Sequence, residues 1–394
     1  MTKSVLFLGA FVCFFSCGGS KEIKDDVILS PDYKELKIAE GLNEFESSFE
    51  AIFEEVSFIP IDLTDSLYLA SIDKMEIGKD RMFLLDKKLS QLVICGLDGN
   101  LERKVGKLGF GPSEFQEISD FVLDGDGKHV KIFSNDDMSF YTFLTKSGAF
   151  LEKNRINAYG EGFEKVANDQ YLFYLNHNIS DKSGAYNILL LDKEGNVIKR
   201  FFPFDPDKSN MMVTYSGFLK NSGGHVFFSP PFHNEIFRYD SNLMEFQKVL
   251  QLDINSKYIN ENQDDFQKIA NTRVIVEDLT TRFLGESVFK NDDFIVFTYH
   301  YRAQRRIGVY NLKQQALKCF AKSVEDPIFK LAGKPLYIDS NNNVYFEVST
   351  DQVNTVKDNA PKLYSSLTPE TKSMFESNGE SISYYLLKAK LRDL

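Results

Sequence analysis

The sequence predicts an all-β protein, a six-bladed β-propeller made of four-stranded antiparallel blades. The first observation is a recurring hairpin, in which an apolar strand enters a polar turn with glycine at its tip and an alternating strand leaves it. The tip glycines are Gly99, Gly148 and Gly195, which lie 49 and 47 residues apart. A hairpin at this period indicates small sheets arranged around an axis. The second observation is the content of 36 Phe and 18 Tyr with no Trp, because Phe and Tyr favour pleated sheet surfaces.

Four-strand units can be counted along the chain from the strand patterns. The predicted blades cover residues 72–106, 118–156, 163–204, 216–254, 286–323 and 336–391. A count of seven blades stays open, since strand boundaries inferred from sequence are accurate to only a few residues. An earlier strand, Val56–Asp62, contains Pro60, which cannot donate a ladder hydrogen bond and therefore indicates an edge position. We expect this N-terminal strand to complete the last blade and close the ring.

Three insertions interrupt the period, at residues 206–215, 255–285 and 350–382. In a propeller, third-to-fourth strand turns lie on one face, while inter-blade connections and second-to-third strand loops lie on the other. All three insertions belong to the second group, so the sequence predicts one loop-rich face, where a rigid scaffold carries function. The second insertion has a helix-like pattern at 264–270. In the third, Thr368 followed by Pro369 predicts the start of a helix.

The N-terminus predicts export. Residues 1–16 contain an apolar run of about a dozen residues, shorter than the about 20 needed to span a bilayer, and have the pattern of a signal peptide. Cys17 follows a serine and precedes Gly-Gly-Ser, which resembles a bacterial lipoprotein cleavage site and implies that Cys17 is acylated. The alternative is an ordinary secretory signal. We expect residues 17–44 to be the lipidated cysteine and a flexible tether, and residues 45–394 to be the propeller.

Charge and cysteine usage exclude other classes. The formal net charge is −11, and no basic patch stands out that could replace the counterions of a nucleic acid. We therefore expect no nucleic-acid partner, and contact with the membrane only through the lipid anchor. Cys95 and Cys319 lie in apolar, strand-like contexts and are predicted to be buried thiols. No metal-type spacing is present, and no metal or cofactor is predicted.

The most motif-like segment is the inter-blade sequence Gly106–Phe115, which contains Gly-Phe-Gly-Pro-Ser-Glu at residues 109–114. Its glycines and proline predict a tight turn, and we interpret it first as a structural turn between blades. The functional alternative places Glu114 at the mouth of the channel. Together with Phe58–Asp62 and Ile118–Phe121, this turn resembles six-bladed β-propeller lipoproteins of Bacteroides-like bacteria and, more distantly, NHL-repeat propellers. The resemblance covers about residues 45–392.

Such proteins mostly lack an assigned activity, so the resemblance implies a fold and a location rather than a reaction. The implied location is the outer membrane or cell surface, with a lipid anchor, and an orientation toward the periplasm is left open.

Three histidines, His177, His233 and His300, fall in predicted second-to-third strand loops. Around one channel they could bind a metal ion or act as acid and base with Glu114. The alternative is three separate loop histidines that hydrogen-bond to backbone. An enzyme, either a lyase or a hydrolase and metal-assisted or not, is therefore the second functional hypothesis.

The densest aromatic and basic cluster is Tyr299, Tyr301 and Arg302, followed by Arg305 and Arg306. Aromatic walls with a few fixed polar groups suit a saccharide or peptide, although a solvated hairpin loop would have the same composition. The first hypothesis is therefore a binding module that captures a glycan, a peptide or an envelope protein through the loop-rich face. A scaffold that docks a neighbouring envelope protein is a third possibility, and no catalytic residue is assigned.

Overall fold

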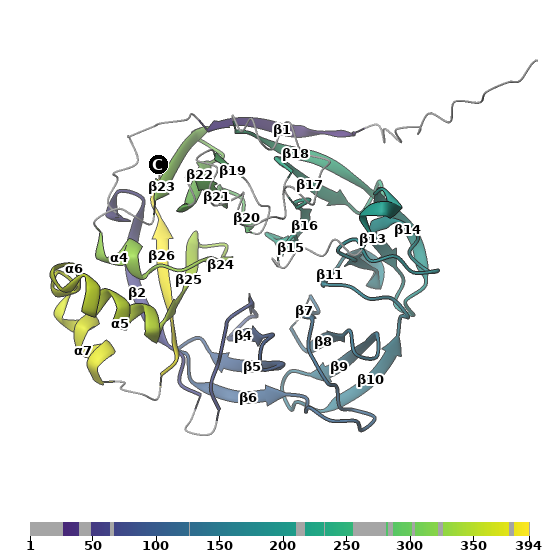
Figure 1. The fold of residues 1–394 in the computed structure, drawn as a ribbon, viewed down its shortest axis with the longest axis horizontal. Coiled ribbons are helices and arrows are strands. Elements are labelled where there is room, and N and C mark those ends of the chain that lie inside the picture. Colours follow the sequence, from purple (N-terminus) through teal and green to yellow (C-terminus); the bar gives the residue numbers. More distant parts are fainter. Residues whose placement is uncertain are drawn as a thin grey trace, which may run out of the picture.

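The computed structural model describes residues 27–38, 49–63, 67–125, 127–209, 217–231, 233–254, 281–282, 287–301, 304–321, 326–377 and 382–393. Six antiparallel sheets stand around a central axis, and each presents its first strand to the centre (Figure 1). The predicted six-bladed propeller is confirmed. No described helix is long and apolar enough to cross a membrane.

The first three blades each contain four consecutive strands. Blade 1 consists of β3 (Lys74–Ile77), β4 (Arg81–Asp86), β5 (Gln91–Gly96) and β6 (Leu101–Val105). Blade 2 consists of β7 (Asp120–Leu123), β8 (His129–Ser134), β9 (Ser139–Leu144) and β10 (Phe150–Arg155). Blade 3 consists of β11 (Gly162–Lys165), β12 (Tyr171–Tyr174), β13 (Tyr186–Leu191) and β14 (Val197–Pro203).

The other three blades each include an additional or distant strand. Blade 4 consists of β15 (Leu219–Ser222), β16 (His225–Phe228), β17 (Glu235–Asp240) and β18 (Glu245–Ile254), with β1 (Leu29–Ile38) outside β18. Blade 5 consists of β20 (Val288–Lys290), β21 (Phe294–Tyr301), β22 (Gln304–Asn311) and β23 (Ala316–Ala321), with β19 (Thr281–Arg282) beside β21. Blade 6 consists of β24 (Pro335–Ile338), β25 (Asn343–Ser349), β26 (Tyr384–Leu391) and β2 (Phe53–Pro60).

Strand β2 closes the ring, as the sequence predicts. It pairs antiparallel with β26, from Phe53 opposite Leu391 to Pro60 opposite Tyr385, and is the outermost strand of blade 6. The proline therefore lies at the end of an edge strand, where its missing donor costs no ladder bond. A Cβ on Gly99 would lie 1.9 Å from the Pro60 carbonyl oxygen, so the glycine lets the blade 1 turn approach the closing strand.

Strand β1 was not predicted. It falls within residues 17–44, which the sequence predicts to be a flexible tether. That prediction is wrong for these ten residues. β1 pairs parallel with β18, with Lys34 opposite Leu250 and Ile38 opposite Ile254, and it lies along the outside of the ring (Figure 1). The sequence gives little sign of a strand because most of its side chains stay exposed and Pro31 interrupts it.

The helices gather mainly in the connections that the sequence assigns to the loop-rich face. Helix α4 (Pro327–Leu331) joins blades 5 and 6, and the short 3-10 helix η4 (Pro206–Lys208) joins blades 3 and 4. Helices α5 (Thr350–Asn359), α6 (Pro361–Ser365) and α7 (Pro369–Ser377) lie between β25 and β26, at the outside of blade 6 (Figure 1). Two further 3-10 helices are η2 (Phe49–Ala51), before β2, and η3 (Ala167–Asp169), in the first hairpin of blade 3.

The helix predicted at Thr368 and Pro369 is confirmed as α7, and the Thr368 hydroxyl accepts a hydrogen bond from the Thr371 amide at 3.2 Å. The helix-like pattern at 264–270 lies outside the described residues.

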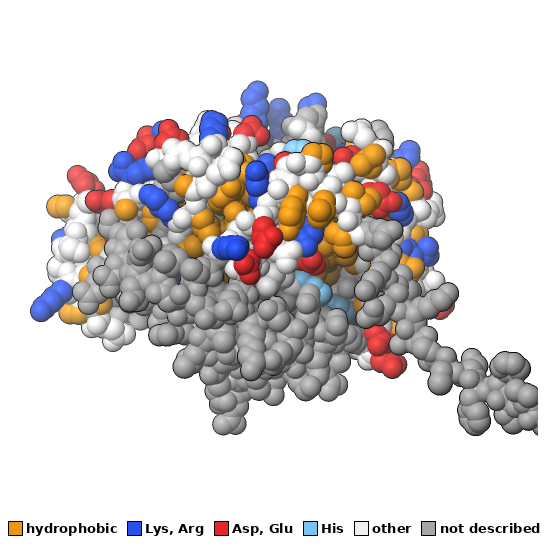
Figure 2. All heavy atoms as spheres, turned by 90° about the horizontal axis from the view of Figure 1, so that it is seen from above, with side chains coloured by type: hydrophobic (Ala, Val, Ile, Leu, Met, Phe, Trp, Pro, Cys, Tyr) orange, Lys and Arg blue, Asp and Glu red, His pale blue; other side chains and the backbone are white. Residues whose placement is uncertain are grey.

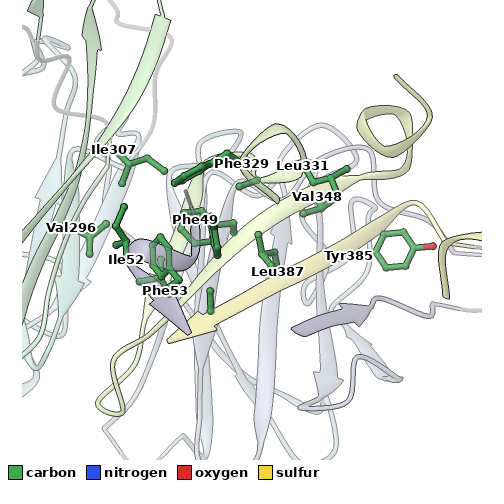
Figure 3. Close-up of a cluster of buried hydrophobic side chains, with 14 of the residues drawn as sticks. Phe49, Ile52, Phe53, Val296, Ile307, Phe329, Leu331, Val348, Tyr385 and Leu387 are labelled. Atoms are coloured by element: carbon green, nitrogen blue, oxygen red, sulfur yellow. The ribbon is translucent and has the colours of Figure 1, made fainter. Parts of the chain in front are cut away.

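The core is divided into seams between neighbouring blades. In the seam between blades 5 and 6, Phe49 stacks on Phe53 with ring centroids 4.4 Å apart and meets Phe329 of α4 edge-on at 4.8 Å (Figure 3). Edge-to-face aromatic pairs add about 0.5–1.5 kcal/mol each beyond the area they bury. Seen edge-on, the visible surface carries charged side chains of both signs (Figure 2).

Candidate functional site

Charged side chains meet in the central channel, on strands that are far apart in the sequence. Lys74 of β3 donates hydrogen bonds to the Phe121 carbonyl at 2.8 Å and to the Glu164 carboxylate at 2.9 Å. It also forms an ion pair with Asp120 at 3.1 Å. These residues belong to blades 1, 2 and 3, so Lys74 reaches across the centre of the ring to blade 3.

The carboxylates of this cluster are held from behind by backbone amides. Asp120 accepts a hydrogen bond from the Phe163 amide at 2.8 Å, and the Asn221 amide donates to Glu164. The side chains of Lys74, Asp120 and Glu164 are exposed by only 11%, 7% and 3%. Buried charges need this full set of partners, because an unpaired ion in the interior is strongly destabilising.

Two further charged groups of the channel have fewer partners. Burial raises the pKa of Glu76 to about 8. The Lys74 ammonium opposes this shift, and the nearby Glu164 carboxylate adds to it. Burial and repulsion from Lys74 lower the pKa of Lys220 on β15 to about 7. For Lys74 itself, the facing carboxylates of Asp120 and Glu164 outweigh burial and raise the pKa above the ordinary lysine value. Burial also raises the pKa of Glu164, against the attraction of Lys74.

This cluster was not predicted from the sequence. A signal was present, since Lys74, Asp120, Glu164 and Lys220 each interrupt an apolar first strand, at successive spacings of 46, 44 and 56 residues. Perturbed ionisable groups that converge in one place are candidates for function, although structural ion-pair networks show the same perturbation.

A second candidate lies at the outer edge of blade 6. A cavity of about 770 Å³, here called the rim groove, lies between η2, β2, the start of α4 and the α6–α7 region. Its lining residues are Phe49, Glu50, Val56, Ser57, Phe58, Asp326, Pro327, Ile328, Ser366, Leu367, Thr368, Glu370, Thr371 and Met374. Three of them are acidic and none is basic.

Local contacts fix the walls of the rim groove. The Asp326 carboxylate caps α4 by accepting from the Ile328 amide at 2.8 Å, and it also accepts from the Phe49 amide at 2.9 Å. On the other side, Phe375 of α7 packs edge-on against Phe58 at 5.2 Å. The outer edge of β2 has no neighbouring strand among the described residues. Within the described part of the chain, the groove therefore borders an unpaired sheet edge.

Glu114, predicted from the inter-blade turn, folds back on its own loop. Its carboxylate accepts from the Gly111 amide at 2.9 Å and pairs with Lys107 at 3.1 Å. These contacts, the Gly111 hydrogen bond first, lower the pKa of Glu114. The geometry is that of the structural turn, which was the first interpretation of this segment.

The histidines and Tyr299 occupy different surroundings. His177 and His233 lie in the second-to-third strand loops of blades 3 and 4, as predicted. His177 is buried beside Phe204, and its amide donates to the Asn187 side chain at 2.9 Å. His233 is half-buried, and its amide donates to the Pro230 carbonyl at 3.1 Å. Tyr299 is 1% exposed and packs in the core between blades 4 and 5.

Other predicted residues lie outside what the structure describes. These are Cys17, Arg302 and the side chains of His300 and Tyr301; the backbone of His300 lies in strand β21 and not in the predicted second-to-third strand loop. Their roles, like a shared site for the histidines, stay predictions. Cys95 and Cys319 are buried free thiols, as predicted. Within the described ranges, no group of three or more His, Cys, Asp or Glu residues could hold a metal ion.

Comparison with known proteins identifies the family. The model of a domain of unknown function, DUF4934, matches residues 34–380. The chain belongs to the DUF4934 family. No curated protein matches the sequence significantly.

Solved structures similar to this DUF4934 chain share its fold. One is a Bacteroides fragilis protein named as exported, with 15% identity and a TM-score of 0.73, covering 91% of this chain and 99% of that chain. Another is a DUF4221 family member from Bacteroides vulgatus, with 8% identity and a TM-score of 0.51, covering 87% of this chain and 98% of that chain. Together with the family match, the six-bladed ring confirms the resemblance to propeller proteins of Bacteroides-like bacteria.

Proposed function

We propose that this DUF4934 protein is a binding module of the cell envelope, held by acyl chains on Cys17. The signal-peptide pattern and the cysteine after it support export and anchoring. The exported relative from Bacteroides fragilis is consistent with that location. The outer membrane or cell surface remains the proposed site, with the periplasmic orientation as the alternative.

Among the ligand classes that the sequence leaves open, the rim groove favours a polypeptide. Its walls combine apolar side chains, such as Ile328 and Met374, with the hydroxyls of Thr368 and Thr371. The open edge of β2 adds main-chain groups to which an extended segment can pair, and this kind of recognition draws affinity from backbone hydrogen bonds.

The charge of the rim groove narrows the choice of segment. Glu50, Asp326 and Glu370 supply negative charge and no lining residue supplies a positive one, so the groove complements a segment that carries Lys or Arg beside an apolar side chain. A glycan is the weaker fit. Pyranose rings are held between aromatic faces, and the lining of the rim groove does not present such faces on its two walls. The single observation that carries the proposal is this acidic, partly apolar groove beside a free strand edge.

The test is a binding titration with the secreted Cys17→Ser chain, which cannot be acylated. The probes are fluorescent eight-residue peptides that alternate apolar residues with Lys, Glu or Ser, at low ionic strength. We expect only the Lys series to bind. Glu370→Lys, in the groove, should weaken that binding about 3- to 10-fold, the range for one favourable charge contact.

Glu376→Lys is the matched control, since Glu376 is exposed on the same helix and lies outside the groove lining. Equal loss in both variants would mean that overall charge, and not the groove, drives binding. Equal binding of the Glu and Lys series would contradict the proposal. Analytical ultracentrifugation distinguishes a further outcome, in which a second copy of the chain occupies the groove and Glu370→Lys dissociates a dimer.

A further inference from the structure

Another large cavity lies between blades 2 and 3, toward the face opposite the loop-rich face. Its volume is about 730 Å³, and it is here called the turn-face pocket. The β7–β8 hairpin, the β11–β12 hairpin and the β13–β14 turn contribute residues to it, and the edge strand β10 forms one wall. First-to-second and third-to-fourth strand turns share one face, because the strands of a blade alternate in direction. The pocket therefore opens where the sequence predicts no insertion.

The lining of the turn-face pocket is polar, and its charges are nearly balanced. It contains five lysine or arginine side chains and four carboxylates, whereas its aliphatic side chains are those of Val122 and Leu151. A ligand with a large net charge of either sign gains little from such a lining. The pocket instead offers many separate hydrogen-bond donors and acceptors.

The inner wall of the turn-face pocket is held in place by its own contacts. The Lys131 ammonium, whose side chain is 12% exposed, donates to the Thr142 hydroxyl at 2.9 Å and pairs with the Glu152 carboxylate at 3.5 Å. It also lies 5.4 Å from the centroid of the Tyr171 ring. These groups are fixed before a ligand arrives, which lowers the entropic cost of binding.

Tyr171 presents a hydroxyl to this pocket that is not used by the fold. The residue is 5% exposed and lines the pocket, and its hydroxyl has no hydrogen-bond partner among the residues that the structure describes. Tyr174 on the same strand instead donates to the Asn176 side chain at 3.1 Å. Burial and nearby carboxylates, that of Asp169 first, raise the pKa of Tyr171 to about 12, so its hydroxyl stays protonated and can donate. Buried tyrosine hydroxyls usually have a partner, so this one indicates an acceptor on a ligand.

We propose that the turn-face pocket binds a neutral oligosaccharide, one of whose hydroxyls accepts a hydrogen bond from the Tyr171 hydroxyl. Each sugar hydroxyl both donates and accepts, and therefore matches a lining in which ammonium groups and carboxylates alternate. An extended peptide is the poorer match, because its side chains need pockets of their own and this lining has little apolar surface. The rim groove has no basic side chain and lacks this balance. The site is separate from the rim groove and does not depend on the proposed function.

A neighbouring cavity extends the turn-face pocket toward the central channel. Its volume is about 420 Å³, and its lining includes Leu123 of blade 2, Val166 of blade 3 and Asn221 of blade 4. Lys165 and Asp169 line both cavities and form an ion pair at 2.8 Å. The two cavities therefore adjoin, and together they suit a chain of sugars better than a single sugar.

The experiment is calorimetric titration of the full secreted Cys17→Ser chain with maltotetraose, cellotetraose, mannotetraose and xylotetraose, and with tetragalacturonate as the charged counterpart. We expect at least one neutral tetrasaccharide to bind more tightly than tetragalacturonate. Tyr171→Phe, which keeps the ring, should weaken that binding about 3- to 10-fold, as for one lost hydrogen bond. Tyr174→Phe is the matched control and should leave binding unchanged, because Tyr174 lies outside the pocket lining.

The length of the bound sugar tests the adjoining cavity. Asn221→Ala changes that cavity and not the turn-face pocket, so it should weaken binding of the tetrasaccharide and leave binding of the corresponding disaccharide unchanged. A second substitution covers the case in which Tyr171→Phe does not fold. Lys193→Ala, at a lining side chain that is 70% exposed, should weaken binding about 3-fold, and Lys146→Ala, on an exposed turn outside the lining, should not.

Three results would overturn the assignment. The pocket is not a saccharide site if none of the four neutral tetrasaccharides binds at millimolar concentration. It is not the site of binding if Tyr171→Phe and Tyr174→Phe, or Lys193→Ala and Lys146→Ala, have equal effects. Tighter binding of tetragalacturonate than of every neutral sugar would show that charge, and not a balanced set of donors and acceptors, selects the ligand.

Discussion

Two strands from the N-terminal part of the chain, β1 and β2, each lie at the outer edge of a blade, yet they are held in opposite ways. β2 pairs antiparallel with β26 and carries Phe53, which is fully buried against Phe49 and Phe346. β1 pairs parallel with β18, its register shifts between Leu29 and Lys34, and most of its side chains are exposed.

The contacts that fasten the two strands differ in kind. The Arg238 guanidinium binds both carboxylate oxygens of Asp32 on β1, at 3.0 and 3.1 Å, and donates to the Ser30 hydroxyl at 2.8 Å. Among the β1 side chains that the structure describes, those of Ser30 and Leu36 alone are buried. β2 is thus part of the core that closes the ring, whereas β1 is attached mainly by polar contacts. The ring therefore depends on β2 for its stability, whereas β1 is an addition to a completed blade.

The largest expected effect comes from removing the aromatic anchor of β2. Phe53→Ala leaves a cavity among Phe49, Phe346 and the adjoining core and should lower the free energy of unfolding by about 3–5 kcal/mol. Chemical denaturation followed by circular dichroism measures it. Val56→Ala on the same strand is the control and should change stability by less than about 0.5 kcal/mol, because Val56 is 37% exposed. Similar losses in both variants would show that Phe53 is no special anchor.

A smaller effect is expected from releasing β1. Arg238→Ala removes the contacts to Asp32 and Ser30, and should change the global free energy of unfolding by less than about 1 kcal/mol, since the Asp32 side of the pair is 52% exposed. Amide exchange in residues 29–38 should rise about 2- to 5-fold. Lys390→Ala, which removes the ion pair with Glu55 of β2, should leave exchange in β2 unchanged. Faster exchange across blade 4 in Arg238→Ala would mean that β1 belongs to the core after all.

The same contact has a pH dependence with a definite sign. Hydrogen bonds from Ser30 and Arg238 and the charge of Arg238 outweigh burial and lower the pKa of Asp32 below its ordinary 3.8. A lowered carboxyl pKa adds stability that is present above about pH 4 and is lost as the pH falls through the folded-state pKa. The protection factors of the β1 amides, corrected for the pH dependence of intrinsic exchange, should therefore fall at acid pH in the wild-type chain, and Arg238→Ala should reduce that dependence.

The smallest effect on stability is expected at Cys17, which precedes β1. Cys17→Ser should leave the unfolding transition unchanged within about 0.5 kcal/mol. It should nevertheless move the exported protein from the detergent phase to the aqueous phase in phase partitioning, because more than one acyl chain anchors stably. Partitioning of the wild-type protein into the aqueous phase would contradict the lipid anchor.

Much of the fold was predictable because its signals are local. Gly99, Gly148 and Gly195 all adopt positive φ, of 90°, 72° and 85°, in third-to-fourth strand turns, and a turn of this kind needs only adjacent residues to specify it. Pro60 marked the edge strand, and Thr368 with Pro369 marked a helix start. β1 escaped prediction because a strand with exposed side chains lacks the apolar alternation by which strands are recognised.

The candidate sites were less predictable. The sequence placed His177 and His233 in the correct loops, yet loop membership does not fix the direction of a side chain. Tyr299 shows the limit plainly, since its place in a strand was compatible with either a binding wall or the core, and the structure buries it. The rim groove needed the packing of α7 on Phe58 and of Phe49 near α4, contacts that no local pattern encodes.

The sequence specified the repeating hairpin, a count of six blades with seven left open, the closing strand and the start of the helix at Pro369, since each follows from spacing, turn chemistry or a missing backbone donor. Only the tertiary structure decided which charges meet in the channel. Lys74 and Glu164 are 90 residues apart, and they come together because ring closure brings the first strands of different blades to one axis. Their pairing arises from burial and distance, which exist only after the ring has formed.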